Sequence, residues 1–544
     1  MTAKADIPIQ AVEKPILCSP YEAPSVHWQY DRTTGEASKI AGRRPSRYWY
    51  KTKDIAGDAA GQLTLELSEG QDDLHTVNQI REDVARWRAS NFEGVTPVTR
   101  ELLNFWASPD RPRRLFFCQL EAVQTVIYLA EILRSGKKPR FNPQFPAADI
   151  GRLVDASPNP DMLPLTRFGC KMATGSGKTV VMAMLIAWAF CNRGRNPGDE
   201  RFPNAVLVCC PNLTVKERLA VLRPERLDNY YAAFDIVPMR MRPLMQNGRV
   251  LVENWHRFAP ESEHAEAGKS YAVVNKGAET PEAFAKRVLG DLYDRMPIMV
   301  LNDEAHHCYR PAPLSDELKK SLSPEALKEA QAENEEATVW IEGLDKLNNA
   351  GGGKAAGQAQ PGIAQCVDLS ATPFYIGGSG YVENSPFPWL VSDFGLVDAI
   401  ESGIVKIPRL PVSDTTGRPE AKYFKLWDNI RDNLEPAEFL PGRGRKPKPD
   451  VVYRDAEPAL KQLAGQWVER FKYIQEAKPG QVQAPPVLII VCDNVDIAEV
   501  FYRKISGEEP IETVTAEDIA DAAEADDAEE GDEEAAPRSR GKSK

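Results

Sequence analysis

A glycine-rich segment between two apolar stretches has the residue types needed to bind phosphate. Residues 172–179 read Met-Ala-Thr-Gly-Ser-Gly-Lys-Thr, after a strand-like run and before a helix-like one. Glycines let backbone N–H groups close around phosphate oxygens, and a helix N-terminus adds a favourable dipole. Lys178 would place a cation near the β- and γ-phosphates, and the Thr179 hydroxyl would coordinate Mg²⁺. Met172 departs from the strict pattern, which begins with glycine. The predicted nucleotide-binding residues are Thr174, Gly175, Ser176, Gly177, Lys178 and Thr179.

Two carboxylates follow a second apolar, strand-like run. This run ends in Asp303 and Glu304. Asp303 would hold magnesium through its water shell, and Glu304 would orient and deprotonate an attacking water. The alternative is a strand that ends in a solvated acidic turn, and this alternative weakens because the phosphate loop lies upstream in the same pattern of elements. We expect Lys178, Asp303 and Glu304 to be catalytic, and Thr179 and Asp303 to be the magnesium ligands. The cradle and the acid pair are expected to meet at neighbouring strand tips.

The histidines and cysteines indicate no structural metal site. His306, His307 and Cys308 are consecutive, so their side chains cannot easily converge on one ion. The nine cysteines include no pair with two residues between them, and we expect free thiols.

The elements that position these residues alternate between strand and helix. Apolar runs at 167–172, 204–210, 249–252, 297–301 and 365–369 predict strands, and a helix is expected from Thr179. This alternation predicts an α/β fold with a parallel sheet and crossover helices. Upstream, Val77, Ile80, Val84 and Trp87 have helical spacing and predict a packed helix.

Composition divides the chain into five parts. Residues 1–110 form an N-terminal region that contains a basic loop at 42–47, interpreted as a solvated turn rather than a phosphate contact. Residues 111–408 carry the strand–helix pattern, with surface insertions expected near 259–292 and 312–362. Residues 409–480 read as a linker and a helix. Residues 481–507 begin a further α/β unit, with a buried strand at 487–492 and a helix capped by Asn494. Residues 508–544 are an acidic tail that we expect to be disordered.

Net charge and apolar content exclude several classes of protein. The chain of 544 residues carries a net charge of −12, but the tail from residue 508 supplies −10 of it. The remaining body is nearly neutral and, at 42% hydrophobic residues overall, can form cores. The longest apolar run is 12 residues at 180–191, whereas a spanning helix needs about 20. The N-terminus lacks a secretory signal, so we expect a cytoplasmic protein with no membrane partner.

The three motifs TGSGKT, DEAHH and LSATP, in this order, resemble those of superfamily 2 DEAD/DEAH-box helicases and translocases. Residues 116–122, 302–307 and 393–406 more closely resemble the ATPase part of type III restriction endonuclease R (Res) subunits. The similarity extends from about residue 15 to residue 507. It implies a RecA-like P-loop NTPase domain with helices on both faces of the sheet. It also implies an ATP- and Mg²⁺-dependent motor that moves on double-stranded DNA through backbone contacts.

The resemblance also implies roles for single residues. Gln119 matches a glutamine that reads the adenine edge, for which a side-chain amide can both donate and accept. Three residues match a segment that contacts the nucleic-acid backbone: Pro211, Asn212 and Thr214. Three others match residues that couple nucleotide state to DNA contact: His306, Ser370 and Thr372. Residues 254–256 match a further motif at a strand end.

The resemblance implies that residues 481–507 begin a second RecA-like domain, which is incomplete because the sequence departs from the resemblance after residue 507. Such motors clamp ATP between two RecA-like domains, and the second supplies arginines worth roughly 10³- to 10⁵-fold in rate. No arginine motif or nuclease is recognisable in this part, so we expect a truncated chain or one half of a split enzyme. The expected partners are a second chain with the missing motor half and nuclease, or a modification methyltransferase subunit. Two alternatives remain open: a nucleotide-responsive binding module without turnover, and an RNA helicase.

Overall fold

The computed structural model describes most of the chain in two separate units. The described residues are 12–31, 34–57, 63–136, 139–259, 279–314, 319, 324–351, 360–407, 426–440, 446–477, 479–480 and 482–508. The first unit runs to Ile407, and the second begins at Pro408. The predicted tail from residue 509 onward lies outside the described residues.

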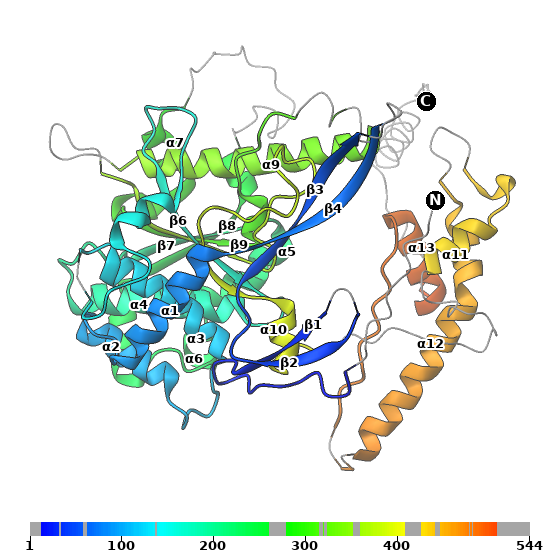
Figure 1. The fold of residues 1–544 in the computed structure, drawn as a ribbon, viewed down its shortest axis with the longest axis horizontal. Coiled ribbons are helices and arrows are strands. Elements are labelled where there is room, and N and C mark those ends of the chain that lie inside the picture. The colour runs from blue at the N-terminus through cyan, green and yellow to red at the C-terminus, as the bar shows by residue number, and fades with distance from the viewer. Residues whose placement is uncertain are drawn as a thin grey trace, which may run out of the picture. The chain divides into compact units, whose positions relative to one another are not determined.

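A seven-stranded sheet organises the first unit (Figure 1). Its order is β11-β6-β10-β9-β7-β8, and β5 pairs with the first two residues of β6. Every neighbouring pair along this order is parallel, and only β5 runs antiparallel to β6. The fold is therefore the expected α/β, RecA-like arrangement. Its strands are β5 (Val154–Asp155), β6 (Leu165–Met172), β7 (Ala205–Cys210), β8 (Arg249–Asn254), β9 (Ile298–Asp303), β10 (Ile363–Ser370) and β11 (Leu390–Phe394).

The five strands predicted within residues 111–408 are confirmed, with ends that shift by a few residues. The sequence prediction did not include β11. This strand is fully buried, but Ser392 and Asp393 interrupt its apolar pattern, so the period-2 and continuous-run signals both fail there.

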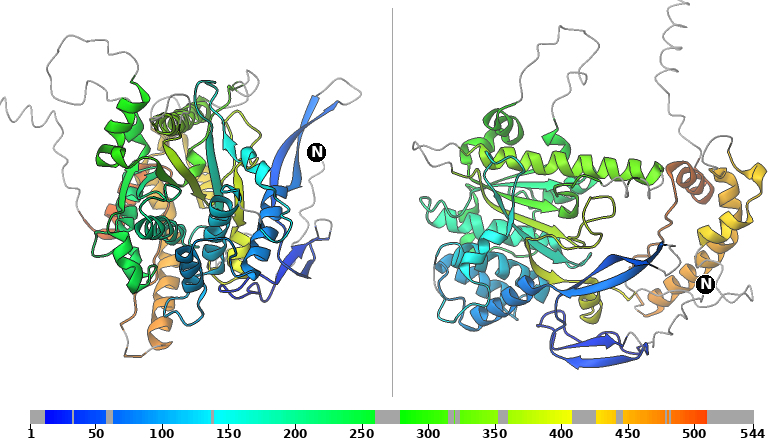
Figure 2. Two further views of the ribbon diagram at one scale, coloured as in Figure 1. Left: turned by 90° about the vertical axis from the view of Figure 1, so that its left-hand side faces the viewer. Right: turned by 45° about the horizontal axis from the view of Figure 1, so that its top comes forward.

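Helices cover both faces of the sheet (Figure 1 and Figure 2). Alternate residues of β7 face opposite sides, since Val206 and Val208 join one apolar cluster whereas Leu207 and Cys209 join another. The first cluster holds α1 (His75–Ala89), α2 (Pro97–Ala107), α3 (Phe117–Ile127) and α4 (Lys178–Arg195). The second holds α7 (Pro281–Leu289) and α9 (Pro324–Asn349). The remaining helices of this unit are α5 (Leu213–Leu219), α6 (Tyr230–Ala233), α10 (Leu396–Glu401), a π-helix (Tyr128–Leu133) and 3-10 turns at Ala147–Arg152, Ala220–Leu222, Met239–Met245, Trp255–Phe258, Gly290–Arg295 and Ala305–His307.

Two predictions of surface insertions are wrong where the structure describes them. Helix α9 lies within the range 312–362, and its Trp340 and Leu344 are completely buried. Helix α7 lies within 259–292, and its Phe284 is also buried. Both helices carry many charges on their outer faces, which hid the apolar stripe that covers the sheet. Residues 260–278, 315–318, 320–323 and 352–359 lie outside the described part.

The N-terminal region is built into the first unit. Helix α1 forms as predicted, and Val77, Ile80, Val84 and Trp87 are all buried. The hairpins are β1 (Val26–Tyr30) with β2 (Ala37–Ala41), and β3 (Arg47–Gly57) with β4 (Leu63–Asp73). The basic loop at 42–47 is not a simple solvated turn, because its Arg43 and Arg44 form ion pairs with Glu121 and Glu401.

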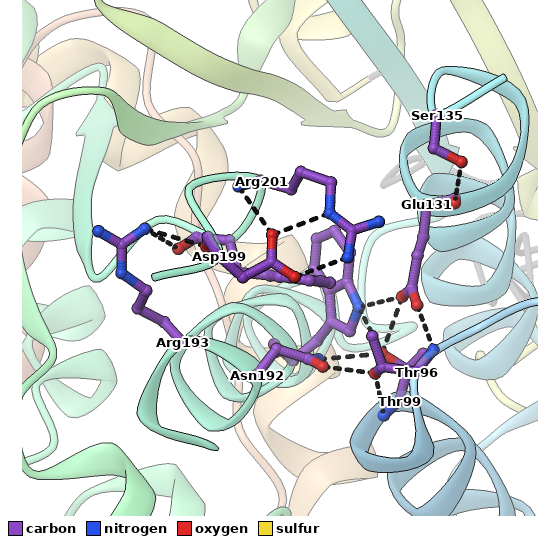
Figure 3. A network of polar contacts seen from close by, with 10 residues as sticks. Thr96, Thr99, Glu131, Ser135, Asn192, Arg193, Asp199 and Arg201 are labelled. Atoms are coloured by element: carbon purple, nitrogen blue, oxygen red, sulfur yellow. Dashed lines mark hydrogen bonds and ion pairs between the residues drawn. The ribbon is translucent and has the colours of Figure 1, made fainter. Parts of the chain in front are cut away.

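A buried polar network fixes the helix that follows the phosphate loop (Figure 3). Glu131, in the π-helix after α3, accepts hydrogen bonds from the Thr99 hydroxyl at 2.8 Å and from the Trp188 indole at 3.1 Å. Asn192 of α4 donates to the same Thr99 hydroxyl at 2.9 Å. Because buried polar groups are costly unless paired, this network specifies how α2, α4 and the π-helix pack together.

The described residues of the second unit form helices α11 (Leu426–Asn433), α12 (Pro449–Ala477) and α13 (Val495–Ser506), together with a 3-10 turn (Pro436–Glu438). Asn494 caps α13 as predicted, accepting from the backbone N–H of Ile497 at 3.0 Å. The prediction of a buried strand at 487–492 is wrong. This segment has no strand pairing, and Val487, Ile489 and Val491 are 77–89% exposed. A strand that is apolar on both faces needs neighbours, and the described residues of this unit supply none.

All nine cysteines are free, as predicted. Among the described residues, no helix combines the length and the apolar character that crossing a membrane requires.

Candidate nucleotide-binding site

The predicted motifs gather at one edge of the sheet because the strands that carry them are parallel. Strands β6, β9 and β10 end at Met172, Asp303 and Ser370, and the phosphate loop, the acid pair and the third motif follow them directly. Open α/β sheets bind ligands at this carboxyl edge. The strand order corrects one expectation, because β10 lies between β6 and β9. The phosphate loop and the acids therefore do not follow neighbouring strands, and they meet across the tip of β10.

The loop after β6 has the backbone shape of an anion cradle. Gly175 and Gly177 have φ values of 83° and 93°, a conformation that side chains strongly disfavour. Gly177 is also the N-cap of α4, so the positive end of that helix lies at the loop. A Cβ atom at Gly177 would lie 2.2 Å from Nε2 of Gln119, and no side chain fits there without displacing that amide.

The side chain of Gln119 holds the phosphate-binding loop in place through hydrogen bonds. Its Nε2 donates to the backbone carbonyl of Ser176 at 3.0 Å, and its Oε1 accepts from the backbone N–H of Phe116 at 2.9 Å. The side chain is buried, and both ends of its amide are occupied by the protein. Gln119 thus lies against the predicted loop. Reading an adenine edge, the role that the resemblance implies, requires one of these bonds to be exchanged, and it stays a prediction.

An ion pair joins the phosphate loop to the acid motif. Nζ of Lys178 lies 2.6 Å from Oε1 of Glu304, although 126 positions separate the two residues in the sequence. Glu304 has a φ of 48°, an uncommon left-handed conformation for a residue with a Cβ atom. This backbone turns the chain sharply at the end of β9. Strained backbone of this kind often marks functional sites.

Asp303 has the environment of a cation ligand. The residue is only 8% exposed, and burial raises the pKa of its carboxyl group to about 6, with repulsion by Glu304 adding to the rise and Lys178 opposing it. The site would therefore be stabilised by a further positive charge. Asp303 and the half-buried Thr179 offer a carboxylate and a hydroxyl, the oxygen ligands that Mg²⁺ prefers. The residues present fit Mg²⁺ bound together with a nucleotide.

His306 connects the acid motif to the third motif. Its Nδ1 lies 2.9 Å from Oγ of Ser370, and that hydroxyl accepts the backbone N–H of Thr372 at 3.0 Å. The same Nδ1 lies 3.6 Å from Oε2 of Glu304. Burial, with His307 adding to it, lowers the pKa of His306 to about 4, so the ring is neutral at pH 7. The structure brings the three predicted coupling residues together next to the acid pair.

A buried charge cluster supports this edge from inside the sheet. Arg167 of β6 is completely buried and pairs with Asp155 and Asp368, each at 2.8 Å. It also donates to the backbone carbonyl of Cys308 at 2.9 Å, directly after the two histidines. Asp368 accepts from the Trp389 indole at 2.7 Å. Sequence reasoning missed Arg167 because a charge inside a strand reads as a solvent-facing position, and only the tertiary structure reveals its partners.

His307 faces a second acid that the motifs did not reveal. Oε1 of Glu336, on α9, lies 3.7 Å from Nδ1 of His307 and accepts no hydrogen bond. Burial raises the pKa of Glu336 to about 7, and repulsion by Glu333 adds to the rise. Burial also lowers the pKa of His307, so the ring gives little compensating charge near neutrality.

We expect Glu336 to make the fold less stable as pH rises. A carboxyl group whose pKa rises on folding from its ordinary value near 4.5 stabilises the fold fully below that value and loses this contribution as pH passes through 7. Glu336→Gln should therefore raise the free energy of unfolding at pH 8 by about 1–2 kcal/mol and flatten its change between pH 5 and pH 8. Urea titrations at several pH values measure this. Glu335→Gln, at an exposed neighbour on α9, is the control, and equal behaviour of the two variants would contradict the expectation.

The predicted nucleic-acid segment follows β7 at the same edge of the sheet. Oδ1 of Asn212 accepts the backbone N–H of Val215 at 2.9 Å and thereby caps α5. Asn212 and Thr214 are exposed, and Pro211 is half-buried. The Asn212 side chain thus has a structural role as the cap of α5, whereas the exposed Thr214 hydroxyl takes no part in that cap. Backbone contact by this segment stays a prediction.

Comparison with known proteins identifies the region that carries these motifs. Residues 120–339 match the family model described as "Type III restriction enzyme, res subunit". This match confirms the resemblance to res subunits. These residues, called the res-like region, include the phosphate loop, Asp303 and Glu304, and they are similar to helicase-like, ATP-dependent motors.

The other comparisons add little to the res-like assignment. A solved structure, "The crystal structure of T4 UvsW", matches with 12% identity and a TM-score of 0.22. The match covers 56% of this chain and 43% of that one. This chain thus spans less than half of the solved protein, and a likeness this weak supports no inference about function. No curated protein matches.

Proposed function

We propose that the res-like region is the ATP-dependent motor of a type III-like restriction endonuclease R subunit, which couples Mg-ATP binding and hydrolysis to contact with double-stranded DNA. The observation that carries the proposal is the ion pair between Lys178 and Glu304. It brings a phosphate-binding cation and a candidate base to one point of the sheet edge. Two motifs far apart in sequence are thereby combined in the way that phosphoryl transfer requires.

Each side chain has a defined task in this proposal. Lys178 leaves Glu304 to bind the terminal phosphates, which frees the carboxylate to orient and deprotonate water. Thr179 and Asp303 hold Mg²⁺, which neutralises charge on the phosphates when it is bound. The cradle of Gly175 and Gly177 supplies backbone N–H groups.

The remaining predicted residues act around this centre. His306 and Ser370 connect Glu304 to Thr372 and so couple the nucleotide state to DNA contact. Gln119 holds the loop and would contact the adenine ring by exchanging one of its two hydrogen bonds. Pro211, Asn212 and Thr214 are proposed to meet the DNA backbone, which needs no base-specific groups.

The test is Mg²⁺-dependent ATP binding by the whole chain, followed by hydrolysis with and without duplex DNA. Lys178→Ala removes a charge-assisted contact, and we expect ATP to bind about 10- to 100-fold more weakly, measured by titration of a fluorescent ATP analogue. Lys216→Ala is the matched control, because Lys216 of α5 forms an equally short ion pair, 2.6 Å from Glu253 in the edge strand β8. Equal affinities of the two variants would refute the nucleotide site. Stimulation by RNA and not by duplex DNA would instead favour an RNA helicase.

A second function is favoured by the unpaired segment 487–492. The described residues of the second unit form no RecA-like sheet that could supply arginines to the nucleotide. A nucleotide-responsive binding module would therefore bind ATP with little turnover. Adding a candidate chain that carries the other motor half separates the proposals. Restored hydrolysis supports a split enzyme, and ATP binding with unchanged slow hydrolysis supports a binding module. A methyltransferase subunit can be tested in the same assay.

A further inference from the structure

A cavity of about 810 Å³ lies beside the carboxyl edge of the sheet, away from the phosphate-loop residues. It is lined by the hairpin of β1 and β2, the loop at 43–47, and the first residues of α10. None of the predicted nucleotide-binding residues lines it. Its volume falls within the range of about 300–1,000 Å³ that is typical of ligand sites. The cavity therefore has the size of a binding site that the motor chemistry leaves unassigned.

One wall of this cavity is aromatic and unusually exposed. Trp28, Tyr30 and Trp49 line it, and Tyr30 and Trp49 remain 42% and 41% exposed. Leu396 and Val397, which are 55% and 51% exposed, lie on the side formed by α10. Large apolar side chains that gather in an open hollow mark a surface that a ligand covers. Flat indole and phenol rings suit a flat aromatic ligand.

The remaining lining is polar and carries both basic and acidic side chains. Arg81 donates to the backbone carbonyls of Arg44 and Asp393 at 3.1 Å and 2.9 Å, and to the Ser46 hydroxyl. These acceptors are neutral, as is a fourth, the Asn78 amide oxygen at 3.5 Å, so the bonds orient the guanidinium group without forming an ion pair. Arg43, by contrast, is held by both oxygens of Glu121. The positive charge of Arg81 therefore favours an anion in the cavity.

Other charged residues reduce the positive potential of the cavity and limit the charge of the ligand that it can bind. Lys171 pairs with Asp393 at 3.1 Å, and Arg47 pairs with Asp73 at 2.7 Å. Asp31 and Asp398 also line the cavity. A ligand with one or two negative charges fits this balance better than a highly charged one. Gln29 and Gln71 add amide groups that can both donate to and accept from a heterocycle.

We propose that this cavity binds one nucleotide unit, whose base stacks on Tyr30 and Trp49 and whose phosphate is held near Arg81. Stacking on aromatic rings tolerates any base, so the ligand is defined by its class rather than by its sequence. The unit comes either from a single-stranded nucleic acid or from a free mononucleotide. The site is independent of the proposed motor function, because it needs neither Mg²⁺ nor hydrolysis.

The test measures binding of a fluorescein-labelled oligothymidylate to the whole chain by anisotropy, without Mg²⁺ or ATP. We expect the double variant Tyr30→Ala/Trp49→Ala to bind at least tenfold more weakly, since each stacked ring contributes severalfold or more. Trp49→Phe keeps an aromatic ring and should retain most of the affinity. Tyr473→Ala is the control, because Tyr473 is 62% exposed in the second unit and does not line this cavity. Circular dichroism establishes that each variant is folded.

A competition arm distinguishes the two sources of the nucleotide. Adenosine monophosphate lacks the β- and γ-phosphates that Lys178 is expected to bind, so it probes this cavity separately. Displacement of the oligonucleotide by micromolar adenosine monophosphate supports a mononucleotide site, and displacement by unlabelled oligonucleotide alone supports a single strand. The proposal is overturned if neither ligand binds, or if the folded double variant binds as well as the wild type. Lys178→Ala should leave this binding unchanged, so failure of the motor proposal would not remove it.

Discussion

Replacing Glu304 by glutamine is expected to lower the rate of ATP hydrolysis by about 10²- to 10⁴-fold, the usual contribution of a positioned general base. The amide keeps the size of the side chain but cannot accept a proton from water. It also cannot form the ion pair with Lys178, whose ammonium group then meets the phosphates without competition. Nucleotide affinity should therefore be retained or increased. Hydrolysis under single-turnover conditions and titration of a fluorescent ATP analogue measure the two effects separately.

Glu253→Gln is the matched control for this prediction. Glu253 lies near the end of β8 and pairs with Lys216 at 2.6 Å, so the substitution removes an ion pair of the same kind beside a different strand. Its hydrolysis rate should equal that of the wild type when nucleic acid is absent. Wild-type hydrolysis by folded Glu304→Gln would reject Glu304 as the base. Weakened ATP binding in this variant would assign the carboxylate a binding role instead.

Replacing Arg167 by methionine is expected to cost about 3–5 kcal/mol of unfolding free energy, as when one partner of a buried ion pair is removed. Asp368, only 2% exposed, would lose its cation, whereas Asp155 would keep its ion pair with Arg310. The carbonyl of Cys308 would also lose its donor, which loosens the segment after the two histidines. Denaturation in urea, followed by tryptophan fluorescence, measures the loss.

Two further variants test the origin of this loss. Arg226→Met breaks an exposed ion pair with Asp228 and should leave the free energy of unfolding nearly unchanged, because water screens exposed pairs. The double variant Arg167→Met/Asp368→Asn removes the buried carboxylate that the first substitution leaves without a cation, and it should recover part of the stability. A loss below about 1 kcal/mol in Arg167→Met, or no recovery in the double variant, would contradict the role of charge burial.

The sequence patterns predicted the nucleotide-binding site because its key residues lie in short segments directly after apolar strands. The run that became β9 is buried on both faces and apolar up to Asn302, so it predicted a strand that ends at the acid pair. The run that became β6 is largely buried, although Arg167 and Lys171 interrupt its apolar pattern, and the phosphate loop follows it. The glycines at 175 and 177 indicated a tight loop, and the structure shows that both have the positive φ values that favour glycine. Local sequence was therefore sufficient to predict most strands and helices of the first unit and the phosphate-binding loop.

What sequence did not reveal depends on contacts between distant segments. Strand order is not local, so β10 between β6 and β9 could not be derived from spacing. Arg167 and Glu336 looked like ordinary charged positions until their surroundings were known. The strand prediction at 487–492 failed for the opposite reason. Its apolar run has the correct local pattern, but the described residues of its unit offer no neighbouring strand.

That exposed stretch has a consequence for the behaviour of the protein in solution. Residues 487–491 read Val-Leu-Ile-Ile-Val, carry no charge, and leave backbone N–H and carbonyl groups without strand partners. Such segments readily stack edge to edge with copies of themselves, in the manner of amyloid-forming peptides. We therefore expect this segment to limit the solubility of the isolated chain, so that the protein aggregates as its concentration is raised.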